Sequence, residues 1–146
     1  MYVEPIILSG TDGIITVFNL LIGLNAAEIN IDTITKVVTI AIIGDAISMT
    51  ISYYNSKYTI SKDHNKLIIE SALNFLSFVV FGYLVVFLYT LFKNVIISAI
   101  ISSIFLGIIK SYMIENGFDF VLSLKTCFLV IIGSFMVYLF GRMMKS

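Results

Sequence analysis

Long apolar runs recur along this chain, and only short polar segments separate them. A helix needs about 20 predominantly apolar residues to cross the hydrocarbon core of a bilayer. Inside that core the backbone has no water to bond, so each run must satisfy its own hydrogen bonds, as a helix does. The expected membrane spans cover residues 6–27, 33–54, 67–92, 95–113 and 120–140, and the longest polar loop covers 55–66.

The composition places the chain in the membrane class. Hydrophobic residues make up 59% of it and charged residues 12%, and the mean hydropathy is +1.04. A soluble domain is roughly 45–50% apolar and about 25% charged, so this chain lacks the polar residues that would cover a soluble surface. The sequence therefore predicts one all-α domain over residues 1–146, an integral membrane bundle of five transmembrane helices.

Several function classes are disfavoured. Nine basic and nine acidic residues cancel, so the chain lacks the net positive charge that would indicate nucleic-acid binding. The chain has no Gly-rich phosphate loop, no HExxH, no CxxC and no GxSxG, and we do not expect an enzyme. The N-terminus lacks the basic region of a removable signal peptide. Five spans would put the termini on opposite sides, and the lysines of the loop over 55–66 favour a cytoplasmic N-terminus.

Two carboxylates lie inside the apolar runs. Asp12 is about two turns into the first expected span, and Asp45 is near the middle of the second. An ionisable side chain within a span costs several kcal/mol, so each is a candidate functional residue. Each could also be protonated, or capped by serine and threonine side chains of other helices. Two carboxylates without a basic neighbour are easier to explain if a cation binds them.

Helical spacing extends this candidate site. Asp45, Met49 and Tyr53 are four residues apart and share one face of the second span, with Ser48 beside them. A carboxylate, a thioether and a phenol suit a borderline transition metal better than Mg²⁺ or Ca²⁺, which prefer oxygen alone. Methionine in such a helix can equally serve packing alone. Glu70, near the start of the third span, either binds metal at the membrane surface or is simply solvated.

Small residues surround the two aspartates. Gly10, Gly13 and Gly23 lie in the first span, and Gly44 lies in the second, directly before Asp45. Small residues let membrane helices approach closely. These glycines therefore predict a tight helix interface around the carboxylates.

The stretch from Gly10 to Phe18, followed by Gly23, resembles the first span of vacuolar iron transporters. Members of that family show an Asp-Gly pair, then a Thr-x-Phe-like step and a glycine. The run from Asp45 to Met49 is similar to the family's second span. The resemblance implies a homodimer whose first and second spans line a shared path. It also implies exchange of Fe²⁺, and often Mn²⁺, against protons, moving metal out of the cytosol.

The resemblance also implies roles for single residues. Asp12 corresponds to the family's metal-binding aspartate, Met49 to its methionine, and Asp45 to an aspartate of the bacterial and fungal second span. Many members carry glutamate where this chain has Tyr53, and a polar or acidic residue where it has Ala41. Many also carry a glutamate-rich metal-binding domain where this chain has only the short loop, so metal capture by such a domain is not expected.

The leading hypothesis is a proton-coupled exporter of Fe²⁺ or Mn²⁺ in a vacuolar membrane, another endomembrane or the plasma membrane. The metal is then the transported substrate, no resident cofactor is expected, and the partners are protons, lipid and a second copy of the chain. One alternative is a membrane interaction protein that keeps the fold and does not transport. Another is a small channel whose flux does not respond to a pH gradient.

Overall fold

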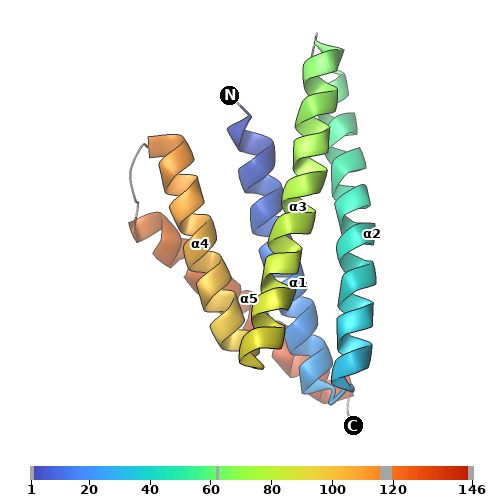
Figure 1. The fold of residues 1–146 in the computed structure, drawn as a ribbon, viewed down its shortest axis with the longest axis vertical. Helices are drawn as coiled ribbons and strands as arrows, with labels where there is room; N and C mark the ends of the chain where they lie inside the picture. Colours follow the sequence, from blue (N-terminus) through green and yellow to red (C-terminus); the bar gives the residue numbers. More distant parts are fainter. Residues whose placement is uncertain (1, 62, 116–119, 145–146) are drawn as a thin grey trace.

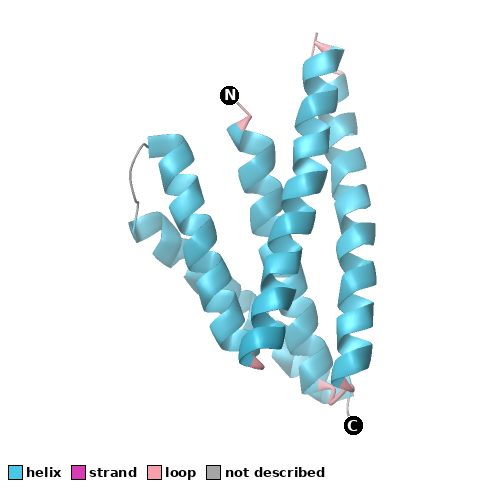
Figure 2. Cartoon of the chain, viewed as in Figure 1, coloured by secondary structure: helices cyan, strands magenta, loops and turns pink. Residues whose placement is uncertain are grey.

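The computed structural model describes residues 2–61, 63–115 and 120–144. Within these ranges the chain forms five helices and contains no strand (Figure 2). The all-helical fold predicted from the apolar runs is therefore confirmed. The helices are α1 (Val3–Ala26), α2 (Ile31–Tyr58), α3 (His64–Phe92), α4 (Val95–Glu115) and α5 (Phe120–Met144).

Three of the described helices have the length and composition that crossing a membrane requires. These are α1, α2 and α3, each with a long and strongly apolar stretch. The described parts of α4 and α5 contain shorter apolar stretches, over Val95–Ile109 and Ile131–Met144. Membrane crossing by the five helices therefore stays a prediction, which the length and composition of α1, α2 and α3 favour.

The connection between α2 and α3 is shorter than the expected polar loop over 55–66. Helix α2 continues through Tyr58, and α3 already begins at His64. The start of α3 is fixed by Asp63, whose side chain accepts a hydrogen bond of 3.0 Å from the backbone N–H of Lys66. Such a cap satisfies one of the free N–H groups of the first helical turn. The expected loop was therefore too long, because polar residues at both ends of it are helical.

Polar caps also fix the start of α2 and the start of α4. The Asn30 side chain accepts from the backbone N–H of Asp32 at 2.9 Å and starts α2. Helix α3 ends at Phe92, and the next residue, Lys93, has the left-handed φ of 50° that commonly terminates a helix. The side chain of Asn94 then accepts from the backbone N–H of Ile96 at 3.0 Å and starts α4.

Helices α1 and α3 lie side by side and run in the same direction, and their contact is the most extensive in the bundle (Figure 1). Helix α2 runs the opposite way and packs mainly on α3. Helix α4 lies on the other side of α1 and α3, and α5 crosses behind α1 in this view and packs on α1 and α4 (Figure 1). The two chain termini are at opposite ends of the bundle, as an odd number of passes requires (Figure 1).

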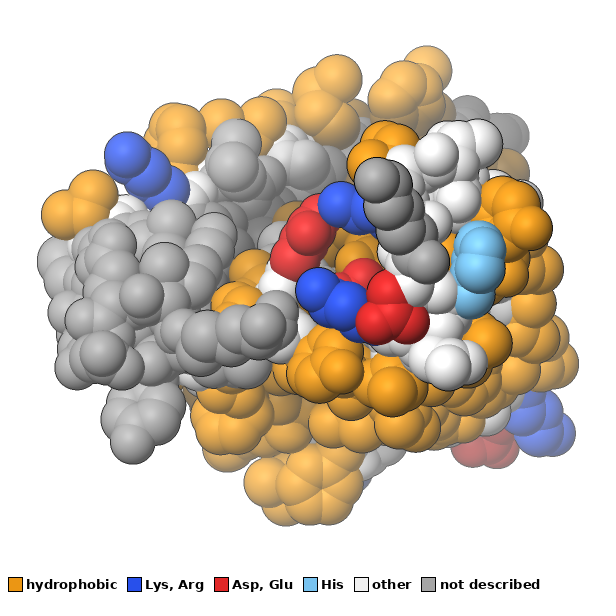
Figure 3. Space-filling model, turned by 90° about the horizontal axis from the view of Figure 1, so that it is seen from above, with side chains coloured by type: hydrophobic (Ala, Val, Ile, Leu, Met, Phe, Trp, Pro, Cys, Tyr) orange, Lys and Arg blue, Asp and Glu red, His pale blue; other side chains and the backbone are white. Residues whose placement is uncertain are grey.

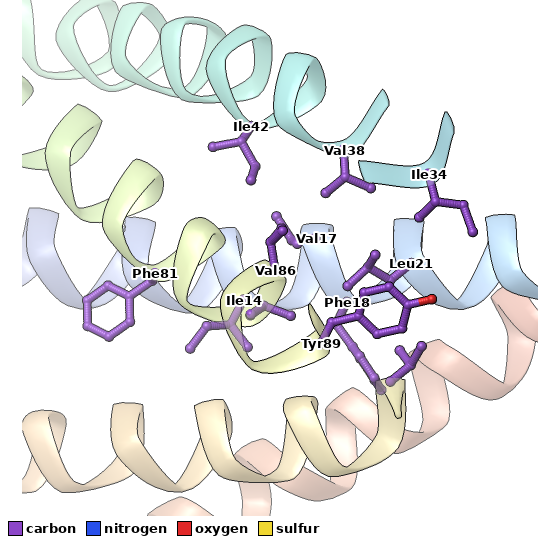
Figure 4. Close-up of a cluster of buried hydrophobic side chains, with 12 residues drawn as sticks. Ile14, Val17, Phe18, Leu21, Ile34, Val38, Ile42, Phe81, Val86 and Tyr89 are labelled. Carbon is purple, nitrogen blue, oxygen red and sulfur yellow. The ribbon is translucent and has the colours of Figure 1, made fainter. Parts of the chain in front are cut away.

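The apolar core occupies one half of the unit formed by α1, α2 and α3 (Figure 4). It comes from the second halves of α1 and α3 and the first half of α2, which antiparallel packing brings to one level. Its side chains recur every three or four residues, the spacing that lines one face of a helix. The core includes Ile14, Val17 and Leu21 of α1, Ile34, Val38 and Ile42 of α2, and Phe81, Val85 and Tyr89 of α3.

Two glycines set the register of the bundle. A Cβ atom added at Gly13 would lie 2.8 Å from the carbonyl oxygen of Phe78, so only glycine lets α1 approach α3 this closely. One turn further along, a Cβ atom at Gly82 would lie 3.2 Å from Val17 and 3.3 Å from Ile42. These contacts place Gly13 level with Phe78, and Gly82 level with both Val17 and Ile42.

Candidate cation site

The register set by Gly13 and Gly82 places Asp12 of α1 and Asp45 of α2 at nearly the same height along the bundle. Asp12 lies five residues before Val17 on α1, and Asp45 lies three residues after Ile42 on the antiparallel α2. At 1.5 Å of rise per residue, the two positions differ in height by only about 3 Å. The Asp45 charge lies near enough to act on Asp12. The two carboxylates therefore lie at one level of two neighbouring helices.

The surroundings of these carboxylates contain no compensating charge in the described part of the chain. Asp12 is half-buried and Asp45 is exposed on the single chain. The described ion pairs join Lys57 to Glu4 and Lys66 to Glu70, and among described residues neither aspartate has a hydrogen bond or an ion pair. The pair is therefore not neutralised by the described protein groups.

Asp45 lines a cavity of about 630 Å³ between α1, α2 and α5. Two further polar side chains line the same cavity, Thr16 and Asn19 of α1. The Asn19 side-chain oxygen accepts a hydrogen bond of 3.2 Å from the hydroxyl of Ser134 on α5. Oxygen atoms from a carboxylate, a hydroxyl and an amide therefore border one space. Such groups can replace part of the hydration shell of a cation.

The stripe formed by Asp45, Met49 and Tyr53, which are four residues apart, winds gradually around α2. Met49, one turn on, is half-buried, and its neighbour Ser48 is exposed. Tyr53 is only 5% exposed, and its hydroxyl donates to a carboxylate oxygen of Glu70 on α3 at 3.3 Å. Each four-residue step rotates a side chain by about 40° around the helix, so the stripe drifts from the outer face toward α3. Tyr53 therefore lies apart from the aspartate pair.

Glu70 belongs to a charged cluster at one end of the bundle. Besides Tyr53 it contacts Lys66, whose Nζ lies 3.7 Å from a Glu70 oxygen. Beside this pair, Lys57 donates to Glu4 at 2.8 Å. Figure 3 shows acidic and basic side chains together on this end face, with apolar and polar side chains beside them. Glu70 is thus partnered within the protein, and its side chain is only 18% exposed.

The glycines near the aspartates serve different contacts. Gly10 and Gly13 are buried, and Gly13 meets the backbone of Phe78. A Cβ atom at Gly23 would lie 3.1 Å from Val137, so this glycine allows close approach of α5. Gly44 has no described atom within 4 Å of such a Cβ position. Within one chain the close contacts of α1 therefore involve α3 and α5.

Two fully buried polar side chains gave little signal in the sequence. Ser9 on α1 and Asn74 on α3 are both 0% exposed. The Ser9 hydroxyl and both polar atoms of the Asn74 amide have no hydrogen-bond partner in the described structure. Asn74 follows Glu70 by one turn, which is a weak hint, whereas serine is too common in apolar helices to single out Ser9.

The described residues contain no cluster of three His, Cys, Asp or Glu side chains that could hold a metal ion. The site of one chain consists of the two aspartates, with Met49 one turn away. No protein-family model, curated protein or solved structure matches this chain. The likeness to vacuolar iron transporters therefore rests on the residues of α1 and α2 alone.

Proposed function

We propose that the chain is an integral membrane protein in which all five helices cross the bilayer. The apolar composition and the length of α1, α2 and α3 support this. Large apolar side chains also cover the outside of the bundle, among them Ile40, Val80, Phe87 and Phe128. An exposed apolar surface of this extent is typical of a protein that contacts lipid. The chain should stay in the membrane fraction after an alkaline carbonate wash; its release into the supernatant would contradict the proposal.

Within that membrane the protein carries a divalent transition metal, Fe²⁺ or Mn²⁺, as its transported substrate. The observation that supports this most is the pair Asp12 and Asp45, two carboxylates within electrostatic reach and without a described basic partner. Uncompensated charge at this depth is costly. A divalent cation between the two would neutralise both carboxylates. Met49, one turn along α2, adds a soft sulfur donor that favours a transition metal over Mg²⁺ or Ca²⁺.

Exchange against protons follows from the chemistry of these ligands. A carboxylate binds metal only when it is deprotonated, so metal and protons compete for Asp12 and Asp45. The end that carries Lys57 and Lys66 faces the cytosol by the positive-inside rule. Metal would then leave the cytosol for a vacuole-like store or the outside while protons move the other way.

A homodimer would cover a polar face of α2 that the single chain leaves open. Gly44, Asp45 and Ser48 are all exposed on the outer side of α2. A charged group there is expensive against lipid, and small residues permit a close helix contact. A second copy packed on this face would shield Asp45 and bring two aspartate pairs together.

Metal binding separates this function from the alternative of a non-transporting membrane scaffold. The pairing of Tyr53 with Glu70 favours the scaffold, since it occupies two of the accessory groups. Isothermal titration of Mn²⁺ into the purified protein should show micromolar binding that Asp12→Asn and Asp45→Asn abolish. Asp32→Asn is the matched control, because Asp32 is exposed at the first turn of α2. Failure of the unmodified protein to bind would support the scaffold.

A further inference from the structure

Three polar atoms in the interior of the bundle have no hydrogen-bond partner among the described protein groups. They are the hydroxyl oxygen of Ser9 and the amide nitrogen and oxygen of Asn74, and both residues are 0% exposed. An amide removed from water without new partners costs free energy. In native proteins such buried groups are usually hydrogen-bonded to ordered water when the protein offers no partner. The unpaired atoms of Ser9 and Asn74 therefore indicate that a polar ligand, such as water, binds between them.

The register places these two residues at the same level. Gly13 of α1 meets the backbone of Phe78 of α3. The two helices run in the same direction (Figure 1). Ser9 lies four residues before Gly13, and Asn74 lies four residues before Phe78. Residues four apart share a helix face, so both positions lie on the α1–α3 interface one turn from this contact.

This level lies between the charged end of the bundle and the aspartate pair. Glu70 is one turn from Asn74 toward the charged end, and Asp12 is three residues from Ser9 in the opposite direction. Successive polar positions are thus about 4.5–6 Å apart along the bundle axis. Beyond Asp12 the interior is closed by the apolar core, where Val85 is 0% and Val17 is 1% exposed. Within the α1–α3 interface, polar groups therefore connect Asp12 to the charged end only.

We propose that Ser9 and Asn74 hold water molecules inside the α1–α3 interface and that this hydrated site links the charged end of the bundle to Asp12. Water supplies both the donor and the acceptor that the Asn74 amide requires. The site gives water access to Asp12 from the end where α2 stops and α3 begins, and the apolar core closes the α1–α3 interface beyond it. A passing cation would use the same route, a step that rests on the proposed transport function.

Thiol reactivity tests the hydration directly. In a Cys127→Ser background, Asn74→Cys and the control Val85→Cys each place one cysteine on α3 at a position that is fully buried in the unmodified protein. The thiolate of a cysteine attacks a thiosulfonate reagent, forming a mixed disulfide and releasing a sulfinate, and this thiolate forms in water but is disfavoured in dry apolar surroundings. A charged, water-soluble reagent should modify Asn74→Cys to completion and leave Val85→Cys unmodified. No modification of either, or equal modification of both, overturns the proposal.

A stability measurement covers the case in which the cysteine variants fold poorly. In a dry site, replacing an unpaired amide by leucine removes a buried polar group and raises the melting temperature. In a hydrated site, Asn74→Leu removes hydrogen bonds to water and lowers it. We expect a lower melting temperature in detergent; a value equal to or above that of the unmodified protein overturns the proposal.

Both measurements use metal-free protein, so their results do not depend on whether the proposed function is correct. If Mn²⁺ binding requires Asp12 but Asn74→Cys is unreactive, transport stands and the hydrated site is wrong. If Asn74→Cys reacts but the protein does not bind Mn²⁺, the hydrated site stands and the metal assignment is wrong.

Discussion

The ammonium group of Lys57 near the end of α2 lies 2.8 Å from the carboxylate of Glu4 in the first turn of α1. On the same end of the bundle, the Tyr53 hydroxyl donates to Glu70 and joins α2 to α3. The three helices that contain the aspartates and the buried amide are therefore connected at one end by polar contacts. At the other end they are joined by the apolar core.

The Lys57–Glu4 pair should contribute little to stability. Its side chains are 38% and 64% exposed, and double-mutant cycles on exposed pairs give about 0.2–1 kcal/mol. We expect Lys57→Met and Glu4→Gln to show a coupling within that range in detergent unfolding, decreasing as salt is added. A coupling of about 3 kcal/mol, typical of a buried pair, would contradict the exposed geometry.

Tyr53→Phe tests the contact between α2 and α3. The change removes the hydroxyl that donates to Glu70 at 3.3 Å and keeps the ring. We expect a loss of about 1 kcal/mol in the free energy of unfolding, the usual net value of one hydrogen bond. Tyr54→Phe is the matched control, because the Tyr54 ring packs on Tyr58 and its hydroxyl has no described hydrogen bond. Equal losses in the two variants would show that the Glu70 contact is not the cause.

Gly13→Ala should weaken the packing of α1 on α3. The new methyl group would lie 2.8 Å from the Phe78 carbonyl oxygen, so one helix must move. Overpacking of this kind costs about 1–3 kcal/mol. The control is Gly133→Ala, whose methyl group would meet its nearest described atom, on Asn19, at an ordinary 3.8 Å. A Gly13→Ala protein that unfolds at the same temperature as the control would contradict the close approach.

The helices could be predicted from sequence because hydrocarbon leaves the backbone few alternatives. Apolar runs placed the start of α5 at Phe120 and the end of α3 at Phe92, as the structure has them. The extent of the loop after α2 was missed, because charged residues such as Lys57 continue a helix when it projects from the apolar region. The capping role of Asp63 was the available signal for the start of α3.

The candidate site could be predicted only in part. The presence of Asp12 and Asp45 in apolar runs marked both residues, but their common level depends on the register set by Gly13 and Gly82. The burial of Tyr53 depends on the drift of a four-residue stripe around α2. A periodicity shows which residues share a helix face, and it does not show which neighbouring helix that face meets.

Metal should stabilise the fold in a pH-dependent manner. A ligand that binds only the folded state at 100 times its dissociation constant adds about 2.7 kcal/mol to the free energy of unfolding. We expect Mn²⁺ to raise the melting temperature at about pH 7.5 and to do so less at about pH 5.5, because protons compete for the carboxylates that bind the metal. Asp12→Asn should remove the effect at both values. An equal shift at both pH values in the unmodified protein would contradict carboxylate ligation.

Transport itself tests the role of the aspartate pair most directly. Proteoliposomes with an imposed pH gradient should accumulate Mn²⁺ when they contain the unmodified protein or the control Asp32→Asn. Vesicles with Asp12→Asn or Asp45→Asn should accumulate no more than protein-free vesicles, provided that the variants insert equally well. Uptake by Asp12→Asn at the rate of the unmodified protein would contradict the assignment of the two carboxylates as the cation site.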